Sequence, residues 1–420
     1  MFTIVSNYND HLSPTLLLTS KDTATVTIKI PSIQLKKTIT IEKHAEFDIP
    51  TSFLKQKTKF RRKRTGTFGI EVVSNAPIAV FAVNSRNDSS GGSLILPESF
   101  LGMNYFPTKS HSFTEGVSEV AITATKDNTA VQVAYPNSNR KLKVVMLNRF
   151  EVLTHLFTPD DVAPVITSSR PVNVQAGRNC AWTAADDLDE CDLLGTDVLP
   201  AKYLHTTYIV PSIYPTANFS IHIVPRYDNT EVTVFDSEGN LLLSEPNIID
   251  NKRHTFDNVH GVSITANEPI YVSQVLHVSS EEPGDASQTT IPPPQLFTNY
   301  YPFLVTSKHD TDSILCITIY SLYDPDAVLL DGKRITAMDS NVIMLPCSGE
   351  FNVQYASVSQ GFHTLTHEDP GAKFGAILYS RGANVEYATY LGLEVPSWYV
   401  PKMADNRNPE SEYVPKIVYN

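Results

Sequence analysis

A chain of 420 residues exceeds the roughly 250–300 residues at which a single hydrophobic core stops growing, so it is expected to form several domains. Hydrophobic residues make up 41% of the chain and charged residues 19%, which excludes a disordered, collagen-like or coiled-coil protein. The net charge of −12 disfavours nucleic acid as a partner, because binding to phosphate depends on Lys and Arg. No stretch approaches about 18 consecutive apolar residues, so no membrane-spanning segment is predicted.

One phrase recurs four times along the chain. Apolar and polar residues alternate on both sides of an Asp-Asn-Thr or similar turn, which carries Asp22, Asp127, Asp228 and, in a weaker copy, Asp324. These positions are 105, 101 and 96 residues apart. The pattern predicts a β-hairpin with one buried face in each copy. Asp and Asn suit the turn, because they bond to the nearby backbone and tolerate unusual φ angles.

A second phrase follows each predicted hairpin. It reads NAPIAVFAVNS, SRPVNVQAGRN, NEPIYVSQVLH and KFGAILYSRG, and its first three copies contain Pro77, Pro171 and Pro269. Proline is tolerated at the first residue of a strand, and the apolar run behind it suits burial on both faces. The phrase therefore predicts the central strand of each unit.

A third phrase ends the first three units. It reads LPESFLGMNY, LPAKYLHTTY and IPPPQLFTNY, in which Pro97, Pro200 and Pro292 precede Tyr105, Tyr208 and Tyr300 by eight residues. We interpret these tyrosines as packing anchors that join the end of one unit to the start of the next.

The predicted fold class is all-β. Helical periodicity is nearly absent, whereas Thr, Val, Ile and Tyr are abundant. A period of about 100 residues suits one sandwich, because a propeller blade needs only about 40–45. We predict a tandem array of about four β-sandwich-like modules of about 100 residues that dock end to end. The predicted boundaries are 1–108, 109–208, 209–304 and 305–398, followed by a C-terminal tail at 399–420.

Four cysteines are spaced so that two local disulfides are predicted. The pairs are Cys180 with Cys191 and Cys316 with Cys347, although four reduced core thiols are an alternative. Closure of the shorter loop would contribute on the order of 3 kcal/mol. No Cys-x-x-Cys pair exists, so a zinc site is not predicted. In a secreted chain, Asn87 and Asn218 are candidate glycosylation sites.

A basic segment stands out in this acidic chain. KQKTKFRRKR carries seven positive charges, at Lys55, Lys57, Lys59, Arg61, Arg62, Lys63 and Arg64. Such a field attracts polyanionic glycans such as heparan sulfate. Arg61 to Arg64 also resembles a proprotein convertase cleavage site, and a solvated loop is the third interpretation.

An acidic segment lies between the first two cysteines. DDLDECD contains Asp186, Asp187, Asp189, Glu190 and Asp192. Clustered carboxylates can bind Ca²⁺, but this spacing is not that of an EF-hand, so we predict a loop that contacts a partner and no metal site. Further along, His363 and His367 lie four residues apart in GFHTLTH, and we interpret them as a structural pair.

These phrases resemble a known family, the N-terminal domain of the IgG-Fc-binding protein of mucus. The resemblance rests on RPVNVQAGRNCAWTAADDLDECDLLGTDVLP, on GFHTLTHEDPGAKFGAILYSRG and on LPESFLGMNY. It implies an extracellular, cysteine-bridged, β-rich binding or adhesion region. It does not imply IgG binding, because no Fc-contact residue maps onto this chain, and no cysteine-rich von Willebrand-type segment follows.

We therefore predict an extracellular binding or adhesion module, secreted or at the cell surface. Loops on a repeated β scaffold would bind a protein or glycan in adhesion, in mucus or matrix organisation, or in host defence. We expect no enzyme and no cofactor, because the familiar catalytic motifs are missing. The alternatives are a glycan-active enzyme that uses carboxylates such as those at 186–192, and a subunit of a self-assembling extracellular layer.

Overall fold

The computed structural model is built of β-strands joined by turns and short helical turns, which confirms the predicted all-β class. It describes residues 1–3, 13–53, 65–86, 89–108, 118–135, 144–157, 163–181, 192–213, 218–248, 252–256, 259–277, 286–306, 312–346, 349–382 and 385–394.

The strands form four successive units. The first contains β1 (Ser13–Ser20), β2 (Ala24–Ile30), β3 (Leu35–Ile41), β4 (His44–Asp48), β5 (Thr65–Thr67), β6 (Glu71–Ser74), β7 (Ile78–Arg86) and β8 (Ser89–Leu94). The second contains β9 (Gly102–Tyr105), β10 (Ser118–Ala124), β11 (Thr129–Ala134), β12 (Val145–Leu147), β13 (Glu151–Phe157), β14 (Val165–Ala181) and β15 (Asp192–Asp197).

The third and fourth units repeat this order. The third contains β16 (His205–Pro211), β17 (Phe219–Pro225), β18 (Thr230–Asp236), β19 (Leu241–Ile248), β20 (Lys252–Phe256), β21 (Gly261–Leu276) and β22 (Ser287–Thr290). The fourth contains β23 (Tyr300–Val305), β24 (Asp312–Tyr320), β25 (Val328–Leu330), β26 (Lys333–Arg334), β27 (Asp339–Leu345), β28 (Gly349–Val358), β29 (Gly361–His367), β30 (Phe374–Gly382) and β31 (Val385–Tyr390). The 3₁₀ turns are η1 (Pro31–Ile33), η2 (Glu98–Phe100), η3 (Ala201–Tyr203), η4 (Pro294–Leu296) and η5 (Pro325–Ala327).

Each unit has two sheets, which makes it sandwich-like as predicted. The axial sheets have the orders β4-β1-β7-β8, β5-β13-β10-β14-β15, β20-β17-β21-β22 and β27-β28-β24-β30-β31. The outer sheets have the orders β3-β2-β6, β12-β11-β14-β9, β19-β18-β21-β16 and β26-β25-β29-β23. The long strands β14 and β21 belong to both sheets of their units. Strands β9, β16 and β23 begin within the third phrase, and each pairs with a strand of the unit that it opens. The predicted domain boundaries remain predictions.

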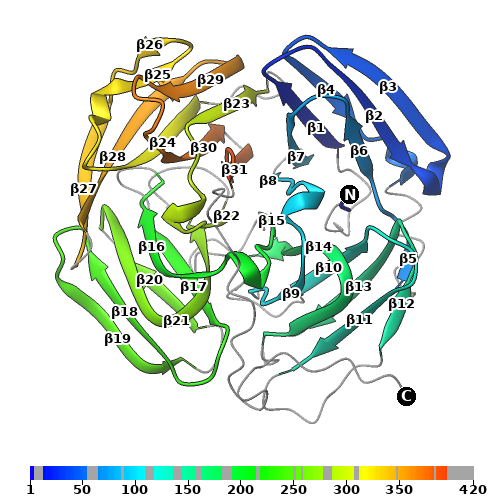
Figure 1. Cartoon of the computed structure of the whole chain (residues 1–420), viewed down its shortest axis with the longest axis horizontal. Coiled ribbons are helices and arrows are strands. Elements are labelled where there is room, and N and C mark those ends of the chain that lie inside the picture. The colour runs from blue at the N-terminus through cyan, green and yellow to red at the C-terminus, as the bar shows by residue number, and fades with distance from the viewer. Residues whose placement is uncertain are drawn as a thin grey trace.

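The four units close into a ring, which the end-to-end array did not anticipate (Figure 1). Strands β8, β15, β22 and β31 lie at its centre, where each contacts the next and β31 contacts β8. One core cluster joins Leu17 and Phe81 of the first unit to Tyr301 and Phe303 of the fourth. The chain is thus folded back so that its first and last units share a core.

The turns of the first phrase form β-arches, so the hairpin prediction is wrong. Strand β10 pairs with β13 and β14, whereas β11 pairs with β12 and β14 in the other sheet. The turn at Asp127 therefore crosses from one sheet to the other. The reason is burial, because every residue of β10 is buried, with its own outer sheet on one side and a neighbouring unit on the other. Asn128 and Asn229 have φ values of 54° and 59°, as the turn chemistry predicted.

In the second phrase the chain passes from one sheet of its unit to the other, next to the arch. Strand β7 begins directly after Pro77, as predicted, but Pro171 and Pro269 lie inside β14 and β21. Both prolines stand at the crossing, where no ladder hydrogen bond is needed from them. The side chain two residues before each proline accepts a hydrogen bond from a backbone N–H of the strand that follows the arch. The bonds are Thr25 N to Asn75 Oδ1 at 2.7 Å, Ala130 N to Ser169 Oγ at 2.9 Å and Glu231 N to Asn267 Oδ1 at 2.8 Å.

The tyrosines of the third phrase are buried packing anchors, with one correction. The hydroxyls of Tyr105 and Tyr208 donate to the carbonyls of Val172 and Ile270, each on the long strand of the unit that the tyrosine's own strand opens. In the third copy this role belongs to Tyr301, which donates to Phe374 O, and not to Tyr300, which is half-buried. The prediction was displaced by one residue because three consecutive prolines left the starting point ambiguous. The η4 turn follows Pro293, so Pro293 and Tyr301 are the pair eight residues apart.

Candidate functional site

The centre of the ring carries a set of equivalent hydroxyl groups. Ser93, Thr196 and Thr289 stand on β8, β15 and β22, each four residues before the proline of the third phrase, and Thr389 takes the same place on β31. In three of the four, the hydroxyl donates a long bond of 3.4–3.5 Å to the next residue's carbonyl. Sequence reasoning missed this ring of hydroxyls, although the Ser or Thr at a fixed distance from the proline was visible.

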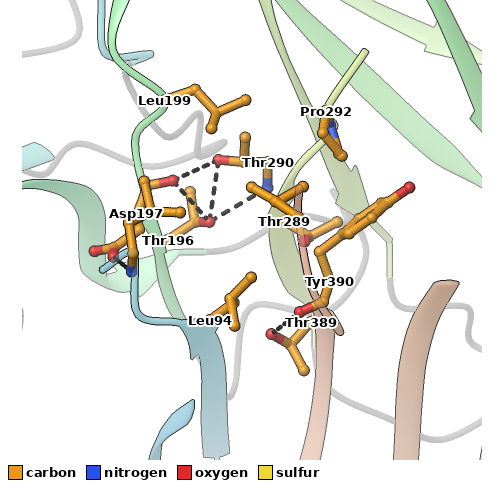
Figure 2. Close-up of a pocket in the computed structure, with 11 residues that line it drawn as sticks. Leu94, Thr196, Asp197, Leu199, Thr289, Thr290, Pro292, Thr389 and Tyr390 are labelled. Carbon is orange, nitrogen blue, oxygen red and sulfur yellow. Dashed lines mark hydrogen bonds between the residues drawn. The ribbon is translucent and has the colours of Figure 1, made fainter. Parts of the chain in front are cut away.

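Polar bonds tie the units together at this axis (Figure 2). Thr290 Oγ1 lies 2.8 Å from the carbonyl of Asp197 and 3.2 Å from Thr196 Oγ1. Tyr271 OH lies 2.6 Å from the same Thr290 hydroxyl. The second and third units are therefore joined by a buried network of neutral donors and acceptors.

The axis holds two cavities, and Asp197, which lines one of them, is the one carboxylate among the described residues that line either. Its Oδ2 accepts bonds from Leu96 N at 2.8 Å and from Asn173 Nδ2 at 3.2 Å, and its backbone N donates to Ser93 Oγ at 3.0 Å. Full burial disfavours the charged form and raises its pKa to about 6, although the bonds from Leu96 and Asn173 act in the opposite direction. In Figure 2 the carboxylate points away from the hydroxyls, while the carbonyl of Asp197 faces them.

Both axial cavities are too small for an organic cofactor or substrate. Each has room for about one water molecule. Close approach of the strands explains this, because a Cβ on Gly92 would lie 2.5 Å from the ring of Tyr387 and one on Gly177 would lie 2.3 Å from Leu194 O. The axis is therefore a packed core, and a binding surface must lie elsewhere on the ring.

Four equivalent strand pairs, one from each unit, terminate on the same side of the ring. They end at Arg86↔Ser89, Ala181↔Asp192, Leu276↔Ser287 and Gly382↔Val385. The second strand of each pair lines the axis, and all four run in the same direction along it. We call this end of the ring the loop end, and the opposite end, which carries the arches at Asp22, Asp127 and Asp228, the turn end.

Most predicted site residues lie outside the described residues. These are the whole basic segment from Lys55 to Arg64, the acidic residues Asp186, Asp187, Asp189 and Glu190, and the sequon Asn87. Of the acidic segment, the structure describes only the backbone of Asp192, at the start of β15. Asn218 is half-exposed and precedes β17 at the loop end, where its carbonyl accepts a bond from His277 N.

The cysteines divide into two cases. Cys180 lies on β14 and Cys191 outside the described residues, so their bridge stays a prediction; Ala181 and Asp192, the residues that follow them, are paired across neighbouring strands. Cys316 is a free, buried thiol that faces the third unit, with Sγ 3.7 Å from Ser212 O. This position gives no support to its predicted bridge with Cys347, which itself lies outside the described residues. Burial raises the pKa of the Cys316 thiol.

The two histidines of the last unit are held by separate partners. Both lie on β29, where His363 Nδ1 is 2.8 Å from Asp331 Oδ2 and His367 Nε2 is 2.9 Å from Asp324 O. Within the described part of the chain, no group of three or more His, Cys, Asp or Glu residues is placed to hold a metal ion. No helix there is both long and apolar enough to span a membrane.

Comparison with known proteins agrees with the resemblance noted in the sequence. A search of curated proteins found no match. A family model described as IgGFc binding protein matches residues 91–380, more than two thirds of the chain, from β8 in the first unit to β30 in the fourth. The chain therefore belongs to the IgGFc binding protein family.

Proposed function

We propose that this protein is an extracellular adhesion module that binds a protein partner with the loop end of its ring. The family is one of protein-binding domains of extracellular type. The immunoglobulin Fc region, which the family's description names, is the first partner to test.

One observation carries the proposal. Four strand pairs end together at the loop end, one from each unit, so the segments between them leave the rigid axial sheets at the same place. Segments held at both ends by strands lose less conformational freedom when they bind than a free chain would. The acidic segment is held in this way by Ala181 and Asp192, and a bridge between Cys180 and Cys191 would restrict it further.

The basic segment gives the ring a second charged region of opposite sign. It precedes Thr65, which pairs with Leu153 of β13 in the second unit, the unit that also carries the acidic segment. A partner with both positive and negative surface would therefore find groups of both signs connected to the same unit. Binding to a sulfated glycan through the basic segment alone is the second candidate, and the charges at Lys55 to Arg64 favour it.

Binding of the non-reduced protein to immobilised Fc and to an array of extracellular proteins tests the proposal. One variant replaces Asp186, Asp187, Asp189 and Glu190 with their amides, and a second replaces the seven basic residues with Gln. The control carries Asp228→Asn and Glu231→Gln, which neutralise exposed carboxylates at the turn end.

We expect a loss of at least tenfold in affinity for the first variant and less than twofold for the control. Equal losses in the two would contradict a binding site at the loop end. Binding to heparin that disappears only in the basic variant would favour the glycan alternative.

A further inference from the structure

The side chain of His363 has a hydrogen-bond acceptor at each of its two ring nitrogens. It lies on β29, where Nδ1 is 2.8 Å from Asp331 Oδ2 and Nε2 is 2.8 Å from the carbonyl of Ser359. A carboxylate and a carbonyl can only accept hydrogen bonds, and a neutral imidazole carries a hydrogen on one nitrogen alone. Both bonds therefore form together only when His363 is a doubly protonated imidazolium cation.

Asp331 supplies the negative charge that a buried cation needs. Its Oδ1 accepts bonds from the N–H of Thr364 at 2.8 Å and from the Thr364 hydroxyl at 3.4 Å. Burial alone would raise the pKa of Asp331, but the bonds from His363 and Thr364 outweigh it and lower the pKa. The carboxylate is therefore ionised throughout the pH range in which histidine changes its charge.

The other elements packed around the imidazole present mainly apolar groups. On β23, the ring centroid of Phe303 lies 5.5 Å from that of the imidazole, in the core shared by the first and fourth units. On its other side β29 pairs with β25, whose residues Val328–Leu330 are all apolar. Lys43 and His44 of the first unit contact the ring of Phe362, the preceding residue of β29. Adjacent side chains of a strand point to opposite faces, so these two basic groups stand on the face away from the imidazole.

His367, on the same face of the same strand, is bound in a different way. Its Nδ1 accepts a bond from the N–H of Asp369 at 2.9 Å, and its Nε2 lies 2.9 Å from the carbonyl of Asp324. One acceptor nitrogen and one donor nitrogen are what a neutral imidazole provides. The two histidines therefore differ in their number of protons, and His367 serves as a reference for His363.

The bond to Ser359 holds a turn at the loop end of the ring. Ser359 and Gln360 are exposed and join β28 of the axial sheet to β29 of the outer sheet. Strand β28 ends beside the start of β24, which in turn lies beside the end of β30. The turn is therefore next to the strand ends at which a partner is proposed to bind.

We propose that His363 is a pH-sensitive switch that fixes this turn when charged and releases it when neutral. As the pH rises, the cation gives one proton to water and keeps a single ring hydrogen. That hydrogen stays on Nδ1, because a lone pair there would face the negative charge of Asp331. The lone pair on Nε2 then repels the carbonyl of Ser359, and the bond that holds the turn is lost.

The switch has a consequence for binding that rests on the proposed function. A partner that covers the turn would meet an ordered surface at low pH and would have to order the turn itself at high pH. Ordering a segment on binding costs free energy, so such a partner should bind more tightly at low pH.

NMR of the protein with labelled histidine rings tests the switch from about pH 5.5 to about pH 9. At the lower pH we expect a hydrogen on both nitrogens of His363, whereas His367 should carry one, on Nε2, across the range. The carbonyl carbon of Ser359 should shift as His363 titrates. The order parameter of the Ser359 amide should fall from about 0.85 to below about 0.6. A single hydrogen on His363 at the lower pH, or Ser359 signals that do not change, would overturn the proposal.

Two matched variants assign the response to one side chain. His363→Gln removes the titrating group, so the Ser359 signals should no longer respond to pH. His367→Gln should leave that response at its original size. An unchanged response in the first variant would contradict the switch, and the titration of the unmodified protein stands if either variant fails to fold. No partner protein is needed, so failure of the switch would leave the proposed binding function untouched.

Discussion

The contact surface between the first and second units differs in kind from the one between the fourth and first units. The first surface is crossed by the continuous chain and by a buried carboxylate, since Glu71 binds Lys29 of its own unit and Arg149 of the next. At the second surface, a hydrogen bond from Thr19 Oγ1 to Pro302 O joins the two units. Apolar side chains such as Phe81 and Phe303 fill it.

Aromatic contacts surround the closing surface as well. Lys21 lies over the ring of Tyr300 at 5.6 Å, Lys43 lies over Phe362 at 6.0 Å, and His44 stacks on Phe362. We infer that burial of apolar side chains holds the fourth and first units together. Specific polar bonds instead fix the position of the second unit relative to the first, which the chain already connects. Changes at the two surfaces should therefore have effects of different size.

The largest effect is expected at the closing surface. Phe81→Ala removes a side chain that is 2% exposed in the shared core and should lower the free energy of unfolding by about 3–5 kcal/mol. Denaturant titration measures this loss. Leu322→Ala, at an exposed position of the fourth unit, is the control. A loss at Phe81 no greater than at Leu322 would mean that the two units do not share a core.

A smaller effect is expected where Glu71 joins the first two units. Burial alone would raise the pKa of Glu71, but the bonds from Lys29 and Arg149 outweigh it and lower the pKa. Glu71→Gln should cost about 2 kcal/mol at neutral pH, since it removes two charge-assisted bonds. The lowered pKa means that this stability is present above the ordinary value of 4.5 and is lost as the pH falls further. Glu368→Gln, in the exposed pair with Arg334, should have little effect.

Asp197, at the surface between the first and second units, is expected to change stability with pH in the direction opposite to Glu71. Its pKa is raised to about 6 from 3.8, so the folded state holds the proton more tightly than the unfolded state. Stability should therefore fall as the pH rises from about 4 to 6, by on the order of 2 kcal/mol from this group. Asp197→Asn should remove that slope in unfolding curves recorded across this range. An unchanged slope in the variant would assign the titration to another group.

The smallest effect distinguishes two adjacent tyrosines. Tyr301→Phe leaves the carbonyl of Phe374 and the N–H of Thr298 without their hydroxyl partner and should cost about 1 kcal/mol. Tyr300→Phe should cost much less, because that side chain is half-buried. Thermal unfolding of the two variants compares them directly. A greater loss of stability for Tyr300→Phe would mean that Tyr300, and not Tyr301, is the packing anchor of the third copy.

The repeated phrases predicted the all-β class and the four units, because turn chemistry and strand pattern are local properties. They could not predict that β10 and β11 lie in different sheets, since an arch and a hairpin use the same Asp-Asn-Thr turn. Ring closure depends on contacts such as Thr19 with Pro302, which are 283 residues apart. The predicted charged segments remain predictions, and the hydroxyls at the axis were missed because Ser and Thr are common on strands.

Small-angle X-ray scattering tests the closed ring most directly. A compact chain of 420 residues should have a radius of gyration of about 22 Å. Four units docked end to end would be an elongated particle with a radius of gyration of roughly 30 Å or more, since each unit alone contributes about 13 Å. A value near 22 Å with a single compact distance distribution is the result we predict. A value above 30 Å for the monomer would contradict ring closure.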